Sequence, residues 1–243
     1  MTLDQAVAIV TGSSSGIGEA IARRLSAAGC RVVVNSNSSV AAGERIAGEL
    51  ADAIYVQGDV SQPATATKLV NAAIEQWGRL DGLVNNAGRT VPVPMNDIAS
   101  VQPEHWAAVM STNVIGTFQL CQAALPHLQA SADGWIVNIG SVAGIRQTGS
   151  SLPYAVSKAA LHHLTTILAK FGEGVRVNAI APGLIETPWT EEWEVQREFV
   201  ASVTPQKRIG TADDIAAATM GVITSPYSNG AIHLVDGGLG VVV

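Results

Sequence analysis

Cysteine, closely spaced histidine and long apolar runs are scarce or absent in this 243-residue sequence. The two cysteines, Cys30 and Cys121, form neither a CxxC pair nor a metal-binding spacing, which indicates a reducing cytoplasm, with a Cys30–Cys121 disulfide as the alternative. None of the five histidines has the i, i+4 spacing of a zinc site, so no metal centre is predicted. No apolar stretch approaches the roughly 18 residues of a membrane-spanning helix, and the first residues do not resemble a signal peptide.

Charge is also sparse, because charged residues make up 14% of the chain against about 25% in an average protein. Fourteen Lys and Arg stand against 20 Asp and Glu, which gives a net charge of −6 with no basic cluster. Such a chain is unsuited to nucleic acid or to an anionic membrane surface. The 47% of hydrophobic residues predicts a folded protein with apolar surface that other copies of the chain cover in a homo-oligomer.

Short Val- and Ile-rich runs alternate with longer helical patterns along the whole sequence. The patterns predict strands over residues 6–10, 31–34, 53–56, 80–84, 135–139 and 175–180. They predict helices over residues 16–29, 40–51, 63–77, 104–129 and 153–171, and another from about 211. Strands that do not alternate apolar and polar residues are covered on both faces. With no repeat or linker in sight, the prediction is a single α/β domain, residues 1–243, with a doubly wound parallel sheet.

Residues 184–209 do not follow this alternation of short apolar strands and longer helices. They carry Trp189, Trp193 and Phe199 among many glutamates, between the sixth strand and the helix that follows. One interpretation is a pair of amphipathic surface helices that use the aromatic side chains for packing. The other is a substrate-side flap whose apolar face closes over a bound molecule.

A glycine-rich turn, Gly12–Gly18, separates the first predicted strand from the first helix. It reads G-x3-G-x-G rather than the commoner G-x-G-x-x-G, and no lysine follows it as in a phosphate-binding Walker loop. Gly12 permits a tight turn, Gly16 lets a ligand approach the backbone, and Gly18 allows close helix–sheet packing. The following helix presents free N–H groups and a positive dipole end, which suit a pyrophosphate. In this position the turn predicts dinucleotide binding.

Tyr154 and Lys158 lie four residues apart near the start of a predicted helix, and therefore project from one face of it. A free phenol has a pKa near 10, and a neighbouring cation lowers it by about 1–3 units. The pair therefore predicts an acid–base tyrosine. Such a pair also occurs in helices without any catalytic role, so the interpretation depends on the surrounding motifs.

Several polar residues follow the ends of predicted strands. Ser141 ends the fifth strand, Asn85–Gly88 ends the fourth and Pro182–Gly183 ends the sixth, while Asn113 lies in the long helix. In a doubly wound sheet, ligands bind outside the carboxyl ends of the strands. These groups are therefore predicted to converge on one crevice with Tyr154.

Together these motifs resemble the short-chain dehydrogenase/reductase family over essentially the whole chain. The family patterns T-G-x3-G-x-G, N-N-A-G, Y-x3-K and P-G with a later Thr match Thr11–Gly18, Asn85–Gly88, Tyr154–Lys158, and Pro182–Gly183 with Thr187. The interval from Ser141 to Tyr154 and the sequence Asp236-Gly-Gly near the end also match. The resemblance implies a Rossmann-type, seven-stranded parallel sheet with helices on both faces. It also implies hydride transfer between a nicotinamide dinucleotide and a carbonyl or secondary alcohol, in an enzyme that is commonly a tetramer.

The resemblance further implies roles for four catalytic residues. Tyr154 would exchange a proton with the substrate oxygen, and Ser141 would hydrogen-bond the same oxygen as its charge develops. Lys158 would lower the phenol's pKa and hold the nicotinamide ribose. Asn113 would position a water that links Lys158 to solvent.

The cofactor residues implied by the resemblance extend across the chain. Asp59 and Val60 would contact adenine, Asn86–Gly88 the adenosine ribose side, and Ile185 and Thr187 the nicotinamide amide. The full predicted set is Gly12, Ser14, Ser15, Gly16, Ile17, Gly18, Asn35, Ser36, Asn37, Asp59, Val60, Asn86, Ala87, Gly88, Tyr154, Lys158, Pro182, Gly183, Ile185 and Thr187.

One departure bears on the choice of cofactor. A site specific for NAD carries Asp or Glu at the end of the second strand, where it hydrogen-bonds the ribose hydroxyls and repels a 2′-phosphate. Here residues Asn35–Ser39 contain no acid, and Ser15 occupies a usual place of a phosphate-gripping basic residue. The sequence therefore favours NADP(H), with NAD(H) as the alternative.

Three functions are compatible with the sequence. The first is an NAD(P)-dependent carbonyl reductase or alcohol dehydrogenase that acts on a small-molecule ketone or alcohol. The second is a 3-oxoacyl-[acyl-carrier-protein] reductase, which would need a basic patch for which the candidates are Arg89, Arg146, Lys207 and Arg208. The third is a dinucleotide-sensing protein without catalysis, which the presence of both Tyr154 and Lys158 disfavours.

Overall fold

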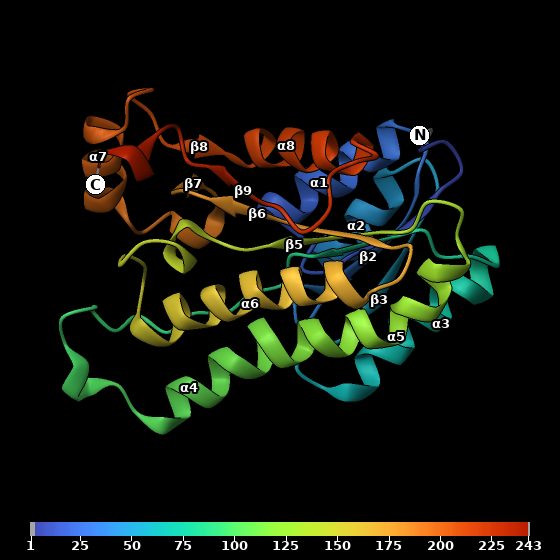
Figure 1. Ribbon diagram of the computed structural model, residues 1–243, viewed down its shortest axis with the longest axis horizontal. Helices are drawn as coiled ribbons and strands as arrows, with labels where there is room; N and C mark the ends of the chain where they lie inside the picture. Colours follow the sequence, from blue (N-terminus) through green and yellow to red (C-terminus); the bar gives the residue numbers. More distant parts are fainter. Residues whose placement is uncertain (1–2, 243) are drawn as a thin grey trace.

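The computed structural model describes residues 3–242 and consists of a central parallel sheet between two layers of helices (Figure 1). The seven strands lie in the order β3-β2-β1-β4-β5-β6-β9. Their bounds are β1 Val7–Val10, β2 Arg31–Ser36, β3 Ala53–Gln57, β4 Gly82–Asn85, β5 Trp135–Ile139, β6 Arg176–Pro182 and β9 Ile232–Val235. A small second sheet pairs β7 (Ile185–Glu186) with β8 (Gly210–Thr211). The predicted doubly wound α/β fold is confirmed; residues 1–2 and 243 of the predicted domain lie outside the described residues.

Helices build one apolar core on each face of the sheet. The upper layer in Figure 1 contains α1 (Gly16–Ala27) and α8 (Ala212–Thr224), and the core on this face also takes in α2 (Val40–Glu49). The opposite face is covered by α3 (Pro63–Trp77), α5 (Thr117–Ala130) and α6 (Leu152–Phe171). Along β1, Ala8 and Val10 pack into the first core while Val7 and Ile9 pack into the second. Burial of both strand faces explains the continuous apolar runs in the sequence.

The two cysteines lie in different cores. Cys30 packs on the α1 side of the sheet and Cys121 on the α5 side, and both are free thiols. Burial raises the pKa of each thiol to about 12. The alternative of a Cys30–Cys121 disulfide is therefore wrong, because the sheet separates the two sulfurs.

The long helix predicted over residues 104–129 is interrupted. A π-helical turn, Ser111–Gly116, joins α4 (Pro103–Met110) to α5 and contains Asn113. At Gly116 a Cβ would lie 2.4 Å from the backbone oxygen of Val60, so the turn passes close to the loop after β3. The spacing of apolar residues does not reveal a helical turn that contains one extra residue. π-Helical turns of this kind are frequent at functional sites.

Residues 184–209 form β7, a 3₁₀ turn over Pro188–Thr190 and one α-helix, α7 (Glu194–Val203). The amphipathic interpretation predicted a pair of helices. The structure has one α-helix in this segment, because the first part of it forms β7, which pairs in parallel with β8. The C-terminal end of the chain lies beside α7 in Figure 1, and Gln206 N–H donates to Gly237 O. Among residues 3–242, no helix has the length and apolar character needed to cross a membrane.

Candidate active site

A cavity of about 1340 Å³ opens where the central strands end. It exceeds the roughly 300–1,000 Å³ of ordinary ligand pockets, which leaves room for a dinucleotide and a second molecule. All the predicted cofactor residues except Gly18 line it, and so does Ser141, which the resemblance predicts to be catalytic. Asn113 lies outside the lining. Within residues 3–242 no group of three or more His, Cys, Asp or Glu side chains could hold a metal ion.

The glycine-rich turn forms a cradle at one end of this cavity. Gly12 and Gly16 have φ values of +62° and +57°, which side chains rarely adopt, and a Cβ on Gly12 would lie 2.9 Å from the Cα of Ala87. Ser15, the residue before α1, makes no side-chain cap, so the side chain leaves the first N–H groups of the helix open. Open N–H groups at a helix start bind phosphate. The observed backbone therefore fits a dinucleotide pyrophosphate.

Gly18 packs against the glycine-rich turn and does not line the cavity. A Cβ at this position would lie 2.4 Å from Asn86 Nδ2 and from Gly12 O. The Asn86 amide donates to the backbone oxygens of Thr11 and Gly12 at 2.9 Å each. Gly18 thus allows the helix to pack against the turn itself, rather than lining the cavity as the sequence-based set implied.

The end of β2 is held by side-chain hydrogen bonds. Asn35 Nδ2 donates to Val56 O and Gly58 O at 3.0 and 3.1 Å, so this amide joins β2 to the loop after β3. Ser36 shares a 2.9 Å hydrogen bond with the Tyr55 hydroxyl. The Asn37 amide donates to the Asp59 carboxylate at 3.3 Å.

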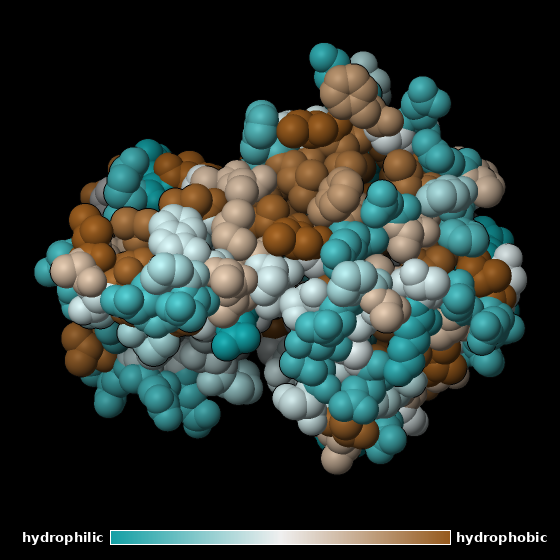
Figure 2. Space-filling view, turned by 90° about the horizontal axis from the view of Figure 1, so that it is seen from below, coloured by the Kyte–Doolittle hydropathy of each residue, from teal (hydrophilic) through white to brown (hydrophobic). Residues whose placement is uncertain are grey.

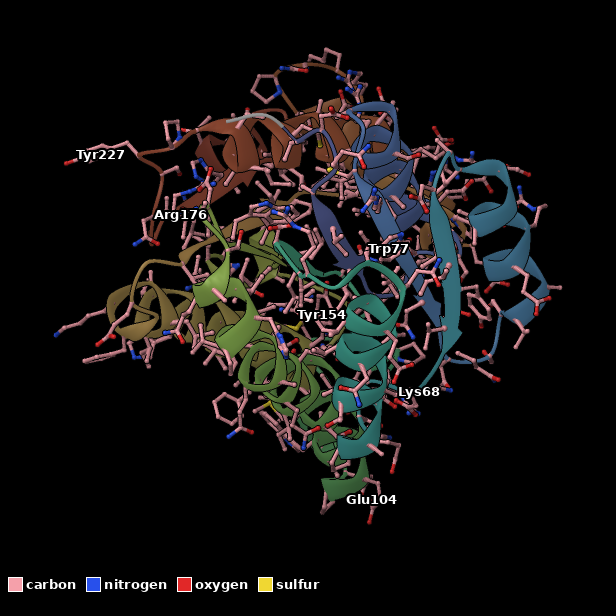
Figure 3. The ribbon with its side chains drawn as sticks, turned by 90° about the vertical axis from the view of Figure 1, so that its right-hand side faces the viewer. Lys68, Trp77, Glu104, Tyr154, Arg176 and Tyr227 are labelled. Carbon is pink, nitrogen blue, oxygen red and sulfur yellow. The ribbon has the colours of Figure 1, made fainter. Side chains whose placement is uncertain are left out.

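Tyr154 and Lys158 project from one face of α6, as their spacing predicts. Lys158 Nζ lies 5.6 Å from the centre of the Tyr154 ring and donates to Ile139 O at 2.8 Å. The Ser151 hydroxyl caps the helix by accepting from the Tyr154 N–H. On its other side the Tyr154 ring meets Trp189 edge-on, with 6.3 Å between ring centres. Tyr154 is half-buried, and its label lies near the middle of the view in Figure 3.

Burial dominates the electrostatics of this pair. Burial raises the pKa of the Tyr154 phenol, and the Ser141 hydroxyl only partly offsets the rise. Burial also lowers the pKa of Lys158 to about 8. For the phenol, the effect of desolvation is larger than that of the Ser141 hydrogen bond. The expectation that Lys158 lowers the phenol's pKa stays a prediction. At neutral pH Tyr154 carries its proton.

Ser141 and Asn113 hold the surrounding main chain. The Ser141 oxygen accepts from the Ala143 N–H at 3.1 Å, so the hydroxyl proton can be donated to the Tyr154 oxygen or, in its place, to a ligand. The Asn113 side chain binds both the N–H and the C=O of Arg89, at 2.7 and 2.9 Å, and donates to Ser157. Asn113 thus fastens the loop after β4 to α6, and its role in a water relay stays a prediction.

Comparison with known proteins agrees with this geometry. A family model described as "Enoyl-(Acyl carrier protein) reductase" matches residues 12–240. The chain is 52% identical to a protein named as ketoacyl reductase 2 of the granaticin polyketide synthase of Streptomyces violaceoruber, over 96% of this chain and 95% of the relative. It is also 34% identical to a 3-oxoacyl-[acyl-carrier-protein] reductase of Thermotoga maritima, over 98% and 99%. The chain belongs to the short-chain dehydrogenase/reductase family.

A solved structure described as a short-chain dehydrogenase/reductase from Burkholderia xenovorans superposes with a TM-score of 0.91 at 31% identity, over 98% of both chains. The 2-(R)-hydroxypropyl-CoM dehydrogenase of Xanthobacter autotrophicus is 39% identical, over 95% of this chain and 97% of the relative. The family thus includes relatives named as reductases and as dehydrogenases. This chain is accordingly an oxidoreductase that transfers a hydride between a nicotinamide dinucleotide and its substrate.

Three polar residues that the sequence analysis did not select support this oxidoreductase site. The Thr11 hydroxyl accepts from the N–H groups of Asn86 and Ala87 at 3.1 Å, and Ser157 joins α6 to Asn113. His162 is buried one turn after Lys158, and its Nε2 accepts from the Ser141 N–H at 3.4 Å. The i+4 spacing from Lys158 was the signal available for His162, but a single histidine carries too little information to use it.

His162 gives the fold a dependence on pH. Burial, followed by the charge of Lys158, lowers the pKa of His162 to about 4, whereas an unfolded histidine titrates near 6.5. Protons therefore bind the unfolded chain more tightly, and stability present above pH 6.5 is lost as the pH falls towards 4. We expect a loss of up to about 3 kcal/mol across this interval.

Urea unfolding at pH 7 and pH 5 measures this loss. His162→Gln keeps an acceptor for Ser141 but cannot titrate, so its stability should change less between the two pH values. The matched control is His163→Gln, since His163 is the exposed neighbour. An unchanged pH dependence in His162→Gln would contradict the prediction.

Proposed function

We propose that this chain reduces a ketone to a secondary alcohol, with NADPH as the hydride donor. The observation that carries the proposal is that Ser141, Tyr154 and Lys158 line the same cavity as the phosphate cradle. A protonated Tyr154 is an acid, which suits reduction rather than alcohol oxidation at neutral pH. The names of the ketoacyl reductase relatives support the same direction.

A bound nicotinamide dinucleotide supplies the hydride, and the chain's own residues handle binding and the proton. The backbone of Gly12–Gly18 and the start of α1 hold the pyrophosphate. The Ser141 hydroxyl donates to the ketone oxygen and stabilises its developing negative charge. Tyr154 delivers its proton to the same oxygen. Lys158, anchored on Ile139 O, presents its remaining N–H donors to the ribose and compensates the charge left on Tyr154.

Oxidation of NADPH by a panel of ketones, followed at 340 nm, tests this function. Turnover of ketones would support it. Tight binding of NADPH without oxidation by any ketone would instead favour the non-catalytic dinucleotide sensor.

The preference for NADPH follows from the end of β2, where Ser36 and Asn37 line the cavity with a hydroxyl and an amide and the neighbouring Asp59 carboxylate accepts from the Asn37 amide. We expect Ser36→Asp to lower kcat/KM for NADPH at least tenfold while sparing NADH, because the new carboxylate repels a 2′-phosphate and accepts from ribose hydroxyls. Steady-state kinetics with NADPH and with NADH give the ratio of the two kcat/KM values for the wild type and for the variant. A wild-type enzyme that already prefers NADH would contradict the proposal.

A 3-oxoacyl-carrier thioester is the second candidate substrate, favoured by the names of several relatives. Of the four basic residues considered for carrier binding, Arg89 and Arg146 line the cavity, while Arg208 is paired with Asp214 and Lys207 Nζ donates to Ser202 O. The structure therefore offers little basic surface at the entrance. Comparing a carrier-bound 3-oxoacyl thioester, an enoyl thioester and free ketones separates the candidates.

We also propose that the chain forms a homotetramer in the cytoplasm. Two buried thiols fit a reducing compartment. The face seen from below in Figure 2 carries brown, apolar surface. In the helical layer that contains α5, α6 and the π-helical turn before α5, the exposed apolar residues include Ile115, Phe118, Val156, Ile167 and Phe171. Light scattering coupled to gel filtration measures the mass directly. A mass of one chain would contradict the tetramer.

A further inference from the structure

The arginines of this chain are almost all neutralised by carboxylates. Within residues 3–242, ion pairs join eight of the ten arginines to Asp or Glu side chains. The two that remain are Arg89 and Arg146, and both line the active-site cavity. An arginine in a cavity without a carboxylate partner offers its donors to an anionic ligand.

Arg146 is held in place. Its Nη2 donates to Gly240 O at 2.5 Å, and Gly240 N–H in turn donates to the Asp236 carboxylate at 2.6 Å. A guanidinium has five N–H donors, of which this bond uses one. Arg89 has its backbone tied to Asn113, but no hydrogen bond orients its guanidinium among the described residues. The prearranged cation is therefore Arg146.

Arg146 belongs to the substrate end of the cavity. It lies five residues after Ser141, on the loop that returns past Tyr154, where a Cβ on Gly149 would lie 3.6 Å from Tyr154 Cδ1. The cofactor cradle, with Gly12 and Asp59, is built from other loops. The only carboxylate side chain in the cavity lining is that of Asp59, on the adenine side. The Asp236 carboxylate lies near Arg146 but outside the lining, where it accepts from the Gly240 N–H and forms no ion pair with the guanidinium.

The opposite wall at this end is aromatic. Trp189, Trp193 and Phe199 line the cavity, and the Trp189 ring contacts Tyr154 edge-on. Trp189 and Phe199 are 44% and 59% exposed, so much of their apolar surface has no protein partner. Aromatic walls of this kind bind planar apolar groups by burial and stacking.

We propose that the substrate is an aromatic keto acid, a ketone that carries a ring system and a free carboxylate. The rings lie on Trp189, Trp193 and Phe199, and the carboxylate binds the Arg146 guanidinium. The two contacts orient the ketone oxygen towards Ser141 and Tyr154. This inference rests on the proposed ketone reduction and specifies its substrate class.

Kinetics with matched ketones test the inference. The probes are 4-(naphthalen-2-yl)-4-oxobutanoate, its neutral methyl ester, and 4-oxopentanoate, which keeps the acid but lacks the rings. A charge-assisted pair contributes about 1.5–3 kcal/mol, so we expect the wild-type enzyme to prefer the naphthyl acid over its ester at least tenfold in kcat/KM. It should also prefer the naphthyl acid over 4-oxopentanoate.

Arg146→Gln should abolish the preference for the acid, with kcat/KM for the ester and Kd for NADPH changed less than threefold. Arg146→Lys should restore part of the preference. Lys170→Gln removes an equal charge from an exposed position at the end of α6, and should leave the preference intact.

Several outcomes would overturn the inference. They are equal kcat/KM for acid and ester in the wild type, an equal loss for both in Arg146→Gln, or weaker NADPH binding in that variant, which would assign Arg146 to the cofactor. Acetoacetyl-CoA is assayed as a further probe, and a loss in Arg146→Gln that is confined to it would assign Arg146 to a phosphate of a carrier arm. If the ester and other ketones are not reduced at all, the proposed function itself has failed.

Discussion

Tyr154→Phe is expected to lower kcat for ketone reduction by about 10²–10⁴-fold, with Kd for NADPH changed less than threefold. The substitution removes one hydroxyl and keeps the ring, so the edge-on contact with Trp189 and the helix cap by Ser151 remain. The ketone oxygen then loses its proton donor, and the remaining Ser141 hydroxyl can only hydrogen-bond it. Single-turnover kinetics with preloaded NADPH separate this loss from any change in cofactor binding.

Tyr227→Phe is the matched control. Tyr227 is fully exposed and projects from the edge of the molecule in Figure 3, far from the half-buried Tyr154. The same chemical change there should leave kcat unaltered. Retention of most activity in Tyr154→Phe would refute the proposed acid and redirect the search to another proton donor in the cavity.

Ser141→Ala is expected to lower kcat by about 10²–10³-fold, the usual effect of removing one donor from a developing oxyanion. The Ser141 oxygen also accepts from the Ala143 N–H, so the variant loses about 1 kcal/mol of capping stability as well. Because the protein stays folded after a loss of this size, the catalytic effect can be measured directly. Thermal unfolding reports the stability change separately.

Thr211→Ala removes a comparable capping hydroxyl at the start of α8, outside the cavity lining. It should reproduce the stability loss and leave kcat within a factor of two. Equal activity losses in the two variants would mean that Ser141 acts through folding alone, which would contradict its proposed contact with the ketone oxygen.

The fold was largely predictable because each strand has a local signature. Val7–Val10 packs alternate residues into two cores, so every position is apolar and the run stands out in the sequence. The break in the long helix was not predictable. The π-turn around Asn113 depends on its hydrogen bonds to Arg89 and on the close approach of Gly116 to Val60, which are contacts between distant segments.

Candidate site residues were predictable to the same extent. The backbone-dependent positions, Gly12 and Gly16, follow from the glycine pattern, and their positive φ values agree with it. The same pattern predicted close packing at Gly18, which the structure shows against the turn itself. The hydrogen bonds of Asn35 to Val56 and Gly58 join distant segments, and no local pattern encodes them. His162 was missed for the same reason, since its partner is the backbone of Ser141 on another element.

The succession of strands and helices along the chain, the glycine-rich turn and the Tyr154–Lys158 spacing can all be read from the sequence. The protonation state of Tyr154 and Lys158 cannot be read from it. Whether Tyr154 carries a proton depends on how much water the fold removes from the phenol compared with the hydrogen bond that Ser141 supplies, and burial raises the pKa of the phenol. Likewise, ten arginines look alike in the sequence, and only the folded chain leaves Arg146 without a carboxylate partner inside the cavity.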